Sequence, residues 1–426
     1  MQKRRLTTIF IIVFVDLLGF SLILPLLAYY ADAYGASAFT ASLLVATYAA
    51  MQFIGAPILG RLSDRHGRRP VLLVSIFGTF VGFLLLGFAE PIGVWLANMV
   101  SPWLGNENPL AIQNQAILGV MFLSRALDGL TGGNISVAMA YITDVTDAEK
   151  RAKGMGLIGA AFGLGFILGP LVGGLLSQWG YHIPAFAAAA IALLNLFAVF
   201  IWLPESLSPE KRTRMVTARR GTFSVRALWQ AISRPRVGPL LQIRFFYGLA
   251  FSTFETMFAL HALYRLGLSA QTTAYTMAYT GVLVVLVQGL AIGWLTARFR
   301  EIMLTFAAVL LLAISLFGWA IVSTLPMLLL ILIPIALSAG ILNTIINSLL
   351  SKSVYPEEVG GTMGLSSSLE SLTRIIAPVL GGIMLGQLGT WAPGIFGAIL
   401  MGLVLYLVWN RLIANPDPPL PQHQQN

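Results

Sequence analysis

The chain has no cysteine and few charged residues among its 426 positions. The lack of cysteine excludes disulfide bonds, thiolate zinc sites and a cysteine nucleophile. Charged residues make up only 10% of the sequence, against about 25% in an ordinary soluble domain. A soluble fold with so few charges could not cover its surface with polar groups, so we expect much of this surface to face lipid.

Long hydrophobic runs fill the rest of a sequence that is 57% hydrophobic, with a mean hydropathy of +0.82. Each run has about 20 residues or more, enough for a helix to cross roughly 30 Å of hydrocarbon. Backbone groups in lipid must pair internally, and the runs are too long for barrel strands, so we predict an all-α membrane protein. The twelve predicted spans are 7–31, 38–62, 70–89, 115–142, 152–178, 184–203, 239–264, 272–297, 302–322, 326–351, 359–388 and 391–413.

The net charge of +9 follows membrane topology. Basic residues concentrate in alternate connections, whereas the connection 90–113 contains no lysine or arginine. This distribution indicates that both termini are cytoplasmic. It predicts contact with anionic lipids and no binding of nucleic acid. The basic connections outside the membrane core are read as 3–5, 61–69, 150–153, 211–244, 298–300, Lys352 and Arg411.

The two halves of the chain carry an internal repeat. A set of residues in the fifth span recurs 208 positions later in the eleventh. Such a repeat predicts two parallel six-helix bundles with a substrate site between them near the membrane midplane. The predicted parts are a bundle at 1–203, a cytoplasmic linker with an interfacial helix at 204–238, a second bundle at 239–414 and a disordered cytoplasmic tail at 415–426. The recurring residues are Met155, Gly156, Leu157, Pro170, Gly173 and Gly174, matched by Met363, Gly364, Leu365, Pro378, Gly381 and Gly382.

Several segments resemble the major facilitator superfamily. The sequence GRLSDRHGRR at 60–69 is similar to the family signature between spans two and three, and GFILGPLVGG at 165–174 resembles its antiporter motif. RALDG at 125–129 resembles the fourth-span arginine motif, although the family more often has a neutral polar residue in place of Asp128. The first span and LPES at 203–206 are similar to tetracycline-resistance and related drug:proton antiporters.

This resemblance implies a twelve-helix major facilitator fold in a cell membrane, in a bacterium the inner membrane. It implies a proton-coupled exporter of a small, lipophilic or cationic molecule such as a tetracycline-like drug. The resemblance is weaker in the second half, where GWLTAR at 293–298 echoes the first signature without its acid.

The signature implies a cytoplasmic gate. We expect Gly60 to let a neighbouring helix approach closely and Asp64 to face the positive N-terminus of span eleven near Val359. Arg68 and Asp144 would complete the charge cluster; the simpler interpretation is a loop of arginines that fixes topology. The predicted gate comprises Gly60, Asp64, Arg65, Gly67, Arg68, Arg69 and Asp144.

The fifth-span motif predicts either a hinge with a close contact to the other bundle or an ordinary bent, tightly packed helix. Its residues are Gly165, Gly169, Pro170, Gly173 and Gly174.

Charged residues inside the spans are costly unless paired or hydrated, so they mark candidate functional positions. We interpret Asp16, Arg125 and Asp128 as a proton-coupling group with Asp16 as the proton carrier. A carboxylate that approaches and leaves a permanently charged arginine can bind a proton on one side of the membrane and release it on the other. The sequence leaves open whether Asp16 or Asp128 pairs with Arg125, and whether the pair is merely structural.

Aromatic and polar residues in the second half indicate substrate contact. Glu255 lies at helical spacing from Phe251, Phe254 and Phe258, and an acid among aromatic rings suits a lipophilic cation. Alternatively, the phenylalanines face lipid and Glu255 is a second proton site. Glu370 and Arg374, four residues apart, are predicted to form an ion pair. The remaining predicted lining residues are Gln52, Gln288, Asn343 and Asn347, amides of a kind that often only joins helices.

Other functions remain as alternatives. A facilitator or proton symporter of a sugar, metabolite or lysolipid would share this fold, and a receptor without transport is a more distant possibility. An enzyme is not expected, because no catalytic triad is apparent and the four histidines have no metal-ligand spacing. No cofactor or metal is expected. The predicted partners are the substrate, protons and lipids, and the predicted state is a monomer.

Overall fold

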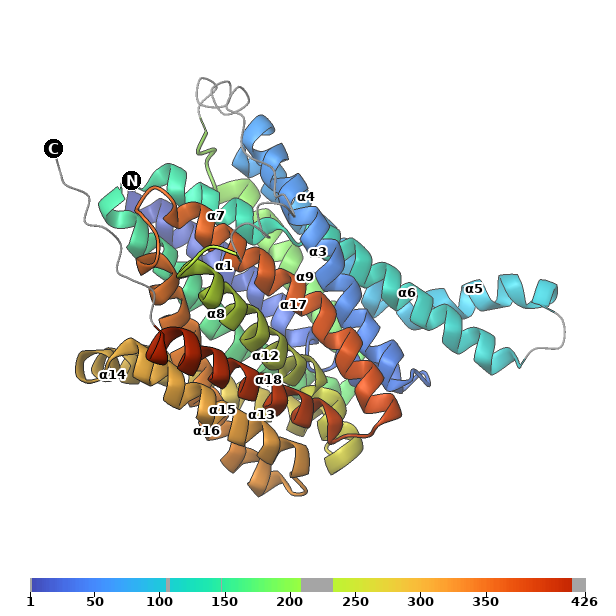
Figure 1. Cartoon of the computed structure of the whole chain (residues 1–426). Helices are drawn as coiled ribbons and strands as arrows, with labels where there is room; N and C mark the ends of the chain where they lie inside the picture. Colours follow the sequence, from blue (N-terminus) through green and yellow to red (C-terminus); the bar gives the residue numbers. More distant parts are fainter. Residues whose placement is uncertain (1, 105–107, 147, 208–232, 416–426) are drawn as a thin grey trace. The chain divides into compact units, whose positions relative to one another are not determined.

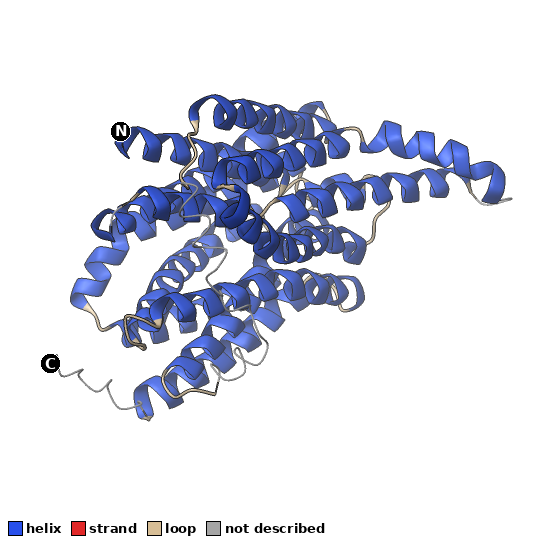
Figure 2. Cartoon of the chain, turned by 90° about the horizontal axis from the view of Figure 1, so that it is seen from above, coloured by secondary structure: helices blue, strands red, loops and turns tan. Residues whose placement is uncertain are grey.

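The computed structural model describes residues 2–104, 108–146, 148–207 and 233–415, and these contain helices but no strand (Figure 2). The predicted linker helix and most of the predicted tail lie outside the described residues. Contacts group the chain into two compact units. Unit 1 comprises Met1–Arg220 and Ala259–Tyr279, and unit 2 comprises Gly221–Phe258 and Thr280–Asn426.

The described part of the first half forms nine α-helices and one 3₁₀ turn, labelled in Figure 1 where space allows. They are α1 (Gln2–Ile23), α2 (Leu27–Asp32), α3 (Ala38–His66), α4 (Arg68–Gly87), α5 (Ala89–Leu104), α6 (Pro109–Thr131), α7 (Asn134–Val145), α8 (Ala148–Leu176), η1 (Ser177–Trp179) and α9 (His182–Trp202).

The described second half forms seven α-helices and two π-helical segments. They are α12 (Val237–Leu266), α13 (Ala270–Leu286), η2 (Val287–Ala291), α14 (Ile292–Arg298), α15 (Glu301–Ile321), α16 (Leu325–Lys352), α17 (Val359–Gln387), α18 (Ala392–Val408) and η3 (Trp409–Ala414).

Eleven helical segments of the described chain are long and apolar enough to cross a membrane. The predicted seventh span, α12, is not among them, although its 30 residues exceed the length that a bilayer requires. Arg244, Glu255 and His261 lower its mean hydropathy. Each of the twelve predicted spans is helical, which confirms the predicted all-α membrane fold.

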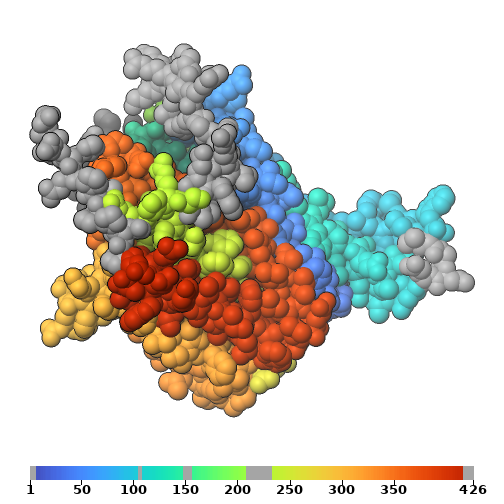
Figure 3. All heavy atoms as spheres, in the orientation of Figure 1, coloured from blue at the N-terminus to red at the C-terminus, as the bar shows by residue number. Residues whose placement is uncertain are grey.

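The connection 90–113 between the predicted third and fourth spans is mostly helical. It forms α5 and the first turn of α6, a helical hairpin that stands out from the rest of unit 1 (Figures 1 and 3). Ala89, Gly93 and Ala97 share the buried face of α5, and a Cβ at Gly93 would lie 2.5 Å from Ile117 of α6. Small residues at helical spacing therefore allow close contact and stabilise a hairpin whose sequence suggested only a connection.

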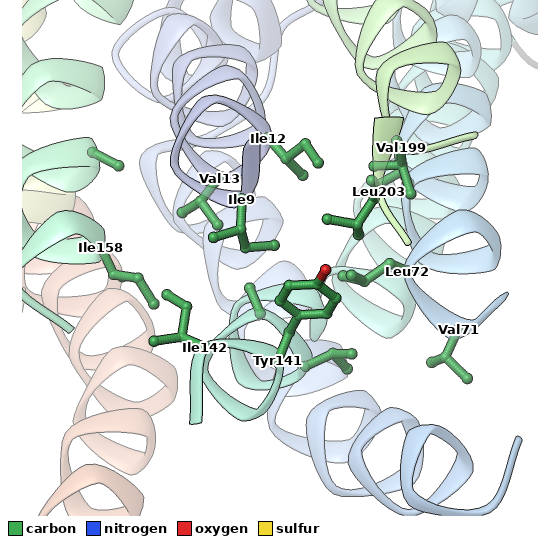
Figure 4. Packing of buried hydrophobic residues seen from close by; sticks show 14 of the residues in the cluster. Ile9, Ile12, Val13, Val71, Leu72, Tyr141, Ile142, Ile158, Val199 and Leu203 are labelled. Carbon is green, nitrogen blue, oxygen red and sulfur yellow. The ribbon is translucent and has the colours of Figure 1, made fainter. Parts of the chain in front are cut away.

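A cluster of buried apolar side chains joins the helices of unit 1 (Figure 4). Ile9 of α1, Leu72 of α4, Tyr141 of α7 and Val199 of α9 belong to it. The Tyr141 hydroxyl donates a hydrogen bond of 3.0 Å to the carbonyl of Pro204, just after α9. Because lipid is itself apolar, such a cluster stabilises the unit by dispersion and close packing rather than by exclusion of water.

The segment Ala259–Tyr279 packs within unit 1 through hydrogen bonds. The Tyr29 hydroxyl lies 2.5 Å from Thr273 Oγ1 and donates to the Leu268 carbonyl at 2.9 Å. The Tyr264 hydroxyl donates to Asp32 Oδ1 at 2.7 Å. These bonds join α2 to the C-terminal end of α12, the N-terminal end of α13 and the short turn between them.

The fifth-span glycines place α8 against α1. A Cβ at Gly169 would lie 1.9 Å from Ser21 Oγ and 2.9 Å from the backbone nitrogen of Leu22. Ser21 Oγ donates a hydrogen bond of 2.7 Å to the carbonyl of Gly165. A Cβ at Gly173 would likewise meet the Leu22 carbonyl oxygen at 2.3 Å, and α8 continues through Pro170. Three of the motif's four glycines thus contact α1 of their own unit.

The glycines of the repeat in α17 pack against a neighbouring helix as those of α8 do. A Cβ at Gly381 of α17 would lie 2.6 Å from Met257 of α12, so in each unit the repeated helix packs on the first helix of its half. Gly174 instead faces α13, where its Cβ would lie 2.8 Å from that of Ala274.

Replacing Gly169 with valine should destabilise unit 1. The added side chain must displace the backbone of α1, and overpacking of this kind costs about 1–3 kcal/mol. Thermal unfolding in detergent should show a midpoint lowered by several degrees. Gly159→Val on the same helix is the matched control, since no atom lies within 4 Å of its Cβ position. Equal midpoints for the two variants would contradict the close α1–α8 contact.

Candidate functional site

The predicted charge cluster lies at the junction of α3 and α4 in unit 1. Gly67 ends α3 and precedes α4 with φ of 107°, a conformation that favours glycine. Arg68 then lies buried, with Nη1 2.7 Å from Asp64 Oδ1 and Nε 3.0 Å from Asp144 Oδ2. Its Nη1 also donates to Ser63 Oγ at 2.6 Å. The predicted grouping of Asp64, Arg68 and Asp144 is therefore present.

Glu205 is a member of this cluster that the sequence did not assign. Its Oε1 accepts from the backbone N–H of Arg68 at 2.9 Å and its Oε2 from that of Arg69 at 3.2 Å. Gly67 has no side chain to cap α4, so a carboxylate from after α9 binds the positive helix N-terminus instead. Ser206 Oγ donates to Asp144 Oδ2 at 3.0 Å and extends the network.

The only sequence signal for Glu205 was its place in the LPES segment. No spacing rule could connect it with a helix start 137 residues earlier.

The other gate residues take up different positions. Arg65 is exposed, and Arg69 places its guanidinium 5.7 Å from the centre of the Phe200 ring. Among the described residues no atom beyond its own helix turn lies within 4 Å of the Cβ position of Gly60, so the close helix approach expected there stays a prediction. Asp64 and Val359 belong to different units, so their predicted contact stays a prediction.

Arg125 and Asp128 form a buried ion pair on α6. Their side chains are each only 3% exposed, and Arg125 Nη1 lies 3.2 Å from Asp128 Oδ2. The guanidinium group also lies 5.3 Å from the centre of the Phe83 ring on α4. A Cβ at Gly82 would lie 2.9 Å from that of Asp128, so the absence of a side chain there lets the two helices approach. In this structure Asp128 is therefore the partner of Arg125.

Asp16 has a different environment on α1. It is half-buried, its carboxyl group interacts with the side chain of Asn134, and it lies close enough to Asp128 for their charges to repel. No ion pair forms on Asp16 within the described part of the chain. Unit 1 thus brings two carboxyl groups and one guanidinium together. Asn134 was not identified from the sequence, where it appeared only as a polar residue after two glycines.

Unit 2 contains the predicted Glu370–Arg374 ion pair, with Arg374 Nη2 3.0 Å from Glu370 Oε1. It also contains an unpredicted partner, Arg244, which forms an ion pair with Glu370 Oε2. Arg244 Nη1 donates to Asn343 Oδ1 at 3.2 Å. Arg244, which the sequence grouped with the basic residues outside the membrane core, lies buried in α12, where pairing with an acid makes a charge tolerable.

The members of the predicted aromatic group share one face of α12 but differ in burial. Phe254 and Phe258 are buried, and the Phe254 ring packs edge-on against Trp319 with a centroid distance of 5.0 Å. Phe251 and Glu255 are half-buried, and the Phe251 ring stacks on Tyr247 at 5.9 Å. Positions 251 and 255 are one helical turn apart, so their side chains can act together.

The four predicted amides also differ in their surroundings. Gln52 Nε2 donates to the Tyr48 hydroxyl and to the Gly132 carbonyl, both at 3.0 Å, which joins α3 to the break between α6 and α7. Asn343 accepts from Arg244, as described above. Gln288 is exposed in η2, and Asn347 is half-buried on α16. Two of the amides therefore hold neighbouring groups in place.

The family of this protein follows from its comparison with known proteins. Residues 9–378 match the family model described as Major Facilitator Superfamily. The chain is a member of the major facilitator superfamily. Within the described residues no cluster of histidine, aspartate and glutamate could hold a metal ion.

Relatives of this superfamily member include transport and resistance proteins. The chain is 32% identical to the class C tetracycline resistance protein of Escherichia coli over 373 residues, 86% of this chain and 84% of that protein. It is 30% identical to solute carrier family 22 member 18 of Rattus norvegicus, with the same coverage. It is 28% identical to multidrug resistance protein 2 of Bacillus subtilis, over 95% of this chain and 96% of that one.

Solved structures support the same fold. The human organic anion transporter MFSD10 (TETRAN) superposes with a TM-score of 0.66 at 23% identity, covering 96% of this chain and 99% of that one. A mutant of the peptide transporter POT gives a TM-score of 0.72 at 17% identity, covering 95% of this chain and 93% of that one.

Replacing Glu205 with alanine should destabilise the end of unit 1 at the start of α4. The N-terminus of α4 would lose its acceptor, and loss of such a cap costs about 1–2 kcal/mol. Thermal unfolding in detergent should therefore shift to lower temperature by several degrees. Glu357→Ala removes an exposed acid and should leave the midpoint unchanged. A Glu205→Ala midpoint equal to that of the control would contradict this capping role.

Proposed function

We propose that this protein exports a small molecule in exchange for protons, by alternating access between the two sides of a cell membrane. Membership of a transporter family and the relatives named for tetracycline and multidrug resistance support export. The observation that carries proton coupling is the environment of Asp16, an acid inside a span next to the paired Arg125 and Asp128.

Charge balance makes Asp16 the exchangeable group. Two ionised carboxyl groups and one guanidinium leave one negative charge uncompensated, which is unfavourable within a membrane. Either a proton or a cationic group of the substrate can neutralise that charge. Since the two neutralise the same charge, they compete, and competition for one site on alternating sides of a membrane produces antiport.

The cycle follows from these roles. Substrate enters from the cytoplasm or the inner leaflet while Asp16 is ionised. The cluster of Asp64, Arg68 and Asp144 then closes the inner side. A proton from outside neutralises Asp16, displaces the substrate and favours the return of the transporter.

The substrate is proposed to be a small lipophilic molecule with a cationic group. Phe251 and Glu255 offer an aromatic surface and an acid on one face of α12. The relatives and structural neighbours are named for tetracycline, multiple drugs, organic anions and peptides. They therefore support transport without fixing one substrate. We place the protein in a cell membrane, with cytoplasmic termini and as a monomer.

Replacing Asp16 with asparagine should abolish proton-driven transport and retain substrate binding. The amide keeps the size of the side chain but cannot bind and release a proton. In proteoliposomes with a pH-sensitive dye, adding a transported tetracycline or cationic dye should release protons with the wild type. The signal of the variant should fall at least about tenfold, the loss expected when a proton-transfer group is removed.

Two controls make this result specific. Glu357→Gln removes an exposed acid and should leave proton release unchanged. Substrate counterflow without a pH gradient should survive in Asp16→Asn. Undiminished uphill export by Asp16→Asn would contradict the proposal. Gradient-independent counterflow of a sugar or lysolipid, with no proton movement, would instead identify a facilitator.

A further inference from the structure

Two arginines of unit 2 bind the same carboxylate but differ in exposure. Arg244 and Arg374 each contact a different oxygen of Glu370. The Arg244 side chain is 6% exposed, whereas the Arg374 side chain is 50% exposed. Arg244 is also bonded to Asn343 of α16. One arginine is therefore fixed among three helices, and the other is accessible on the surface of α17.

We propose that Arg374 binds an anionic group of the substrate, such as a carboxylate, while Arg244 retains Glu370. This inference rests on the proposed export function and specifies its substrate further. It adds an anionic group to the lipophilic molecule with a cationic group proposed above, which makes the substrate a zwitterion. Arg244 becomes a positioning residue, since it holds the internal carboxylate that would otherwise compete with the substrate for Arg374.

The chemistry of arginine supports this assignment. A guanidinium group presents several N–H donors in a planar fork that matches a carboxylate, and it keeps its charge at any physiological pH. The Arg374 side chain is half exposed, so it can present this fork to an anionic group while it bonds to Glu370.

The charges of the region lead to the same assignment. Glu370 is bound by two arginines, so this group of three carries one excess positive charge. Glu255 feels the charges of Arg374 and Glu370, but no ion pair of Glu255 is present in the part of the chain that the structure describes. An anion at Arg374 would neutralise the excess charge at contact distance, which is more favourable than compensation from a distance.

Binding of a matched pair of probes tests the anionic group. The probes are 1-pyrenebutyrate and its neutral amide, titrated by fluorescence against the whole protein in lipid nanodiscs. We expect the wild type to bind the carboxylate more tightly than the amide. Arg374→Gln should weaken binding of the carboxylate at least about tenfold, the worth of a charge-assisted hydrogen-bonded pair, and leave binding of the amide unchanged. Arg298→Gln, which removes an exposed arginine at the end of α14, should bind both probes as the wild type does.

Changes at Glu370 and Arg244 distinguish positioning from mere structural support. Glu370→Gln should tighten carboxylate binding several-fold, because the internal competitor has lost its charge. Arg244→Gln should weaken carboxylate binding, because Glu370 would then have Arg374 as its one arginine partner and would compete more strongly with the probe. The double variant Arg244→Gln/Glu370→Gln should restore carboxylate binding, whereas a purely structural role of Arg244 would give no such rescue.

Several results would overturn the inference. Equal affinity of the wild type for carboxylate and amide would do so, as would weaker carboxylate binding by Glu370→Gln. The proton assay keeps the two proposals apart. Proton release that depends on Asp16, without any preference for the carboxylate, would leave export intact and remove the anionic group. Carboxylate binding that depends on Arg374, with proton release unaffected by Asp16→Asn, would retain the anion site and remove the coupling.

Discussion

Lipid cannot solvate a charge, and this constraint determines how the polar side chains of the protein are arranged. Arg125 lies against Asp128, and Arg244 lies against Glu370, each on a helix that crosses the membrane. Asp16 of unit 1 and Glu255 of unit 2 differ from these, since neither forms an ion pair among the described residues, and the side chain that interacts with Asp16 is the amide of Asn134. Asp16 is also the acid that we propose exchanges a proton.

Close helix packing brings neighbouring helices up to the charged residues of unit 1. Gly82 lets α4 approach Asp128, and Gly169 and Gly173 let α1 approach α8. Without side chains at these positions, the helices lie near enough for polar groups on different helices to meet. The glycines therefore do more than bend a helix: they set the distance between α1, which carries Asp16, and its neighbours. Packing and chemistry in unit 1 depend on the same small residues.

The end of unit 1 at the junction of α3 and α4 combines charge pairing with helix capping. Arg68 joins Asp64 of α3 to Asp144 of α7, while Glu205 binds the start of α4. The guanidinium group and the backbone of Arg68 thus bind acids from three segments of the chain. A bundle tied in this way can move as a rigid body, which alternating access requires of each half.

The sequence by itself determined the helical class, the spans, the repeat and the family, because hydrophobic length and motif spacing are local properties of a chain. It also found the ion pairs between residues three or four apart, such as Arg125–Asp128 and Glu370–Arg374, since helical periodicity brings them together. Only the tertiary structure decided the rest: the partner of Arg125, the role of Glu205 and the pairing of Arg244. Each of these depends on which helices pack together and how closely, and such contacts between distant segments leave no periodic signal in one sequence.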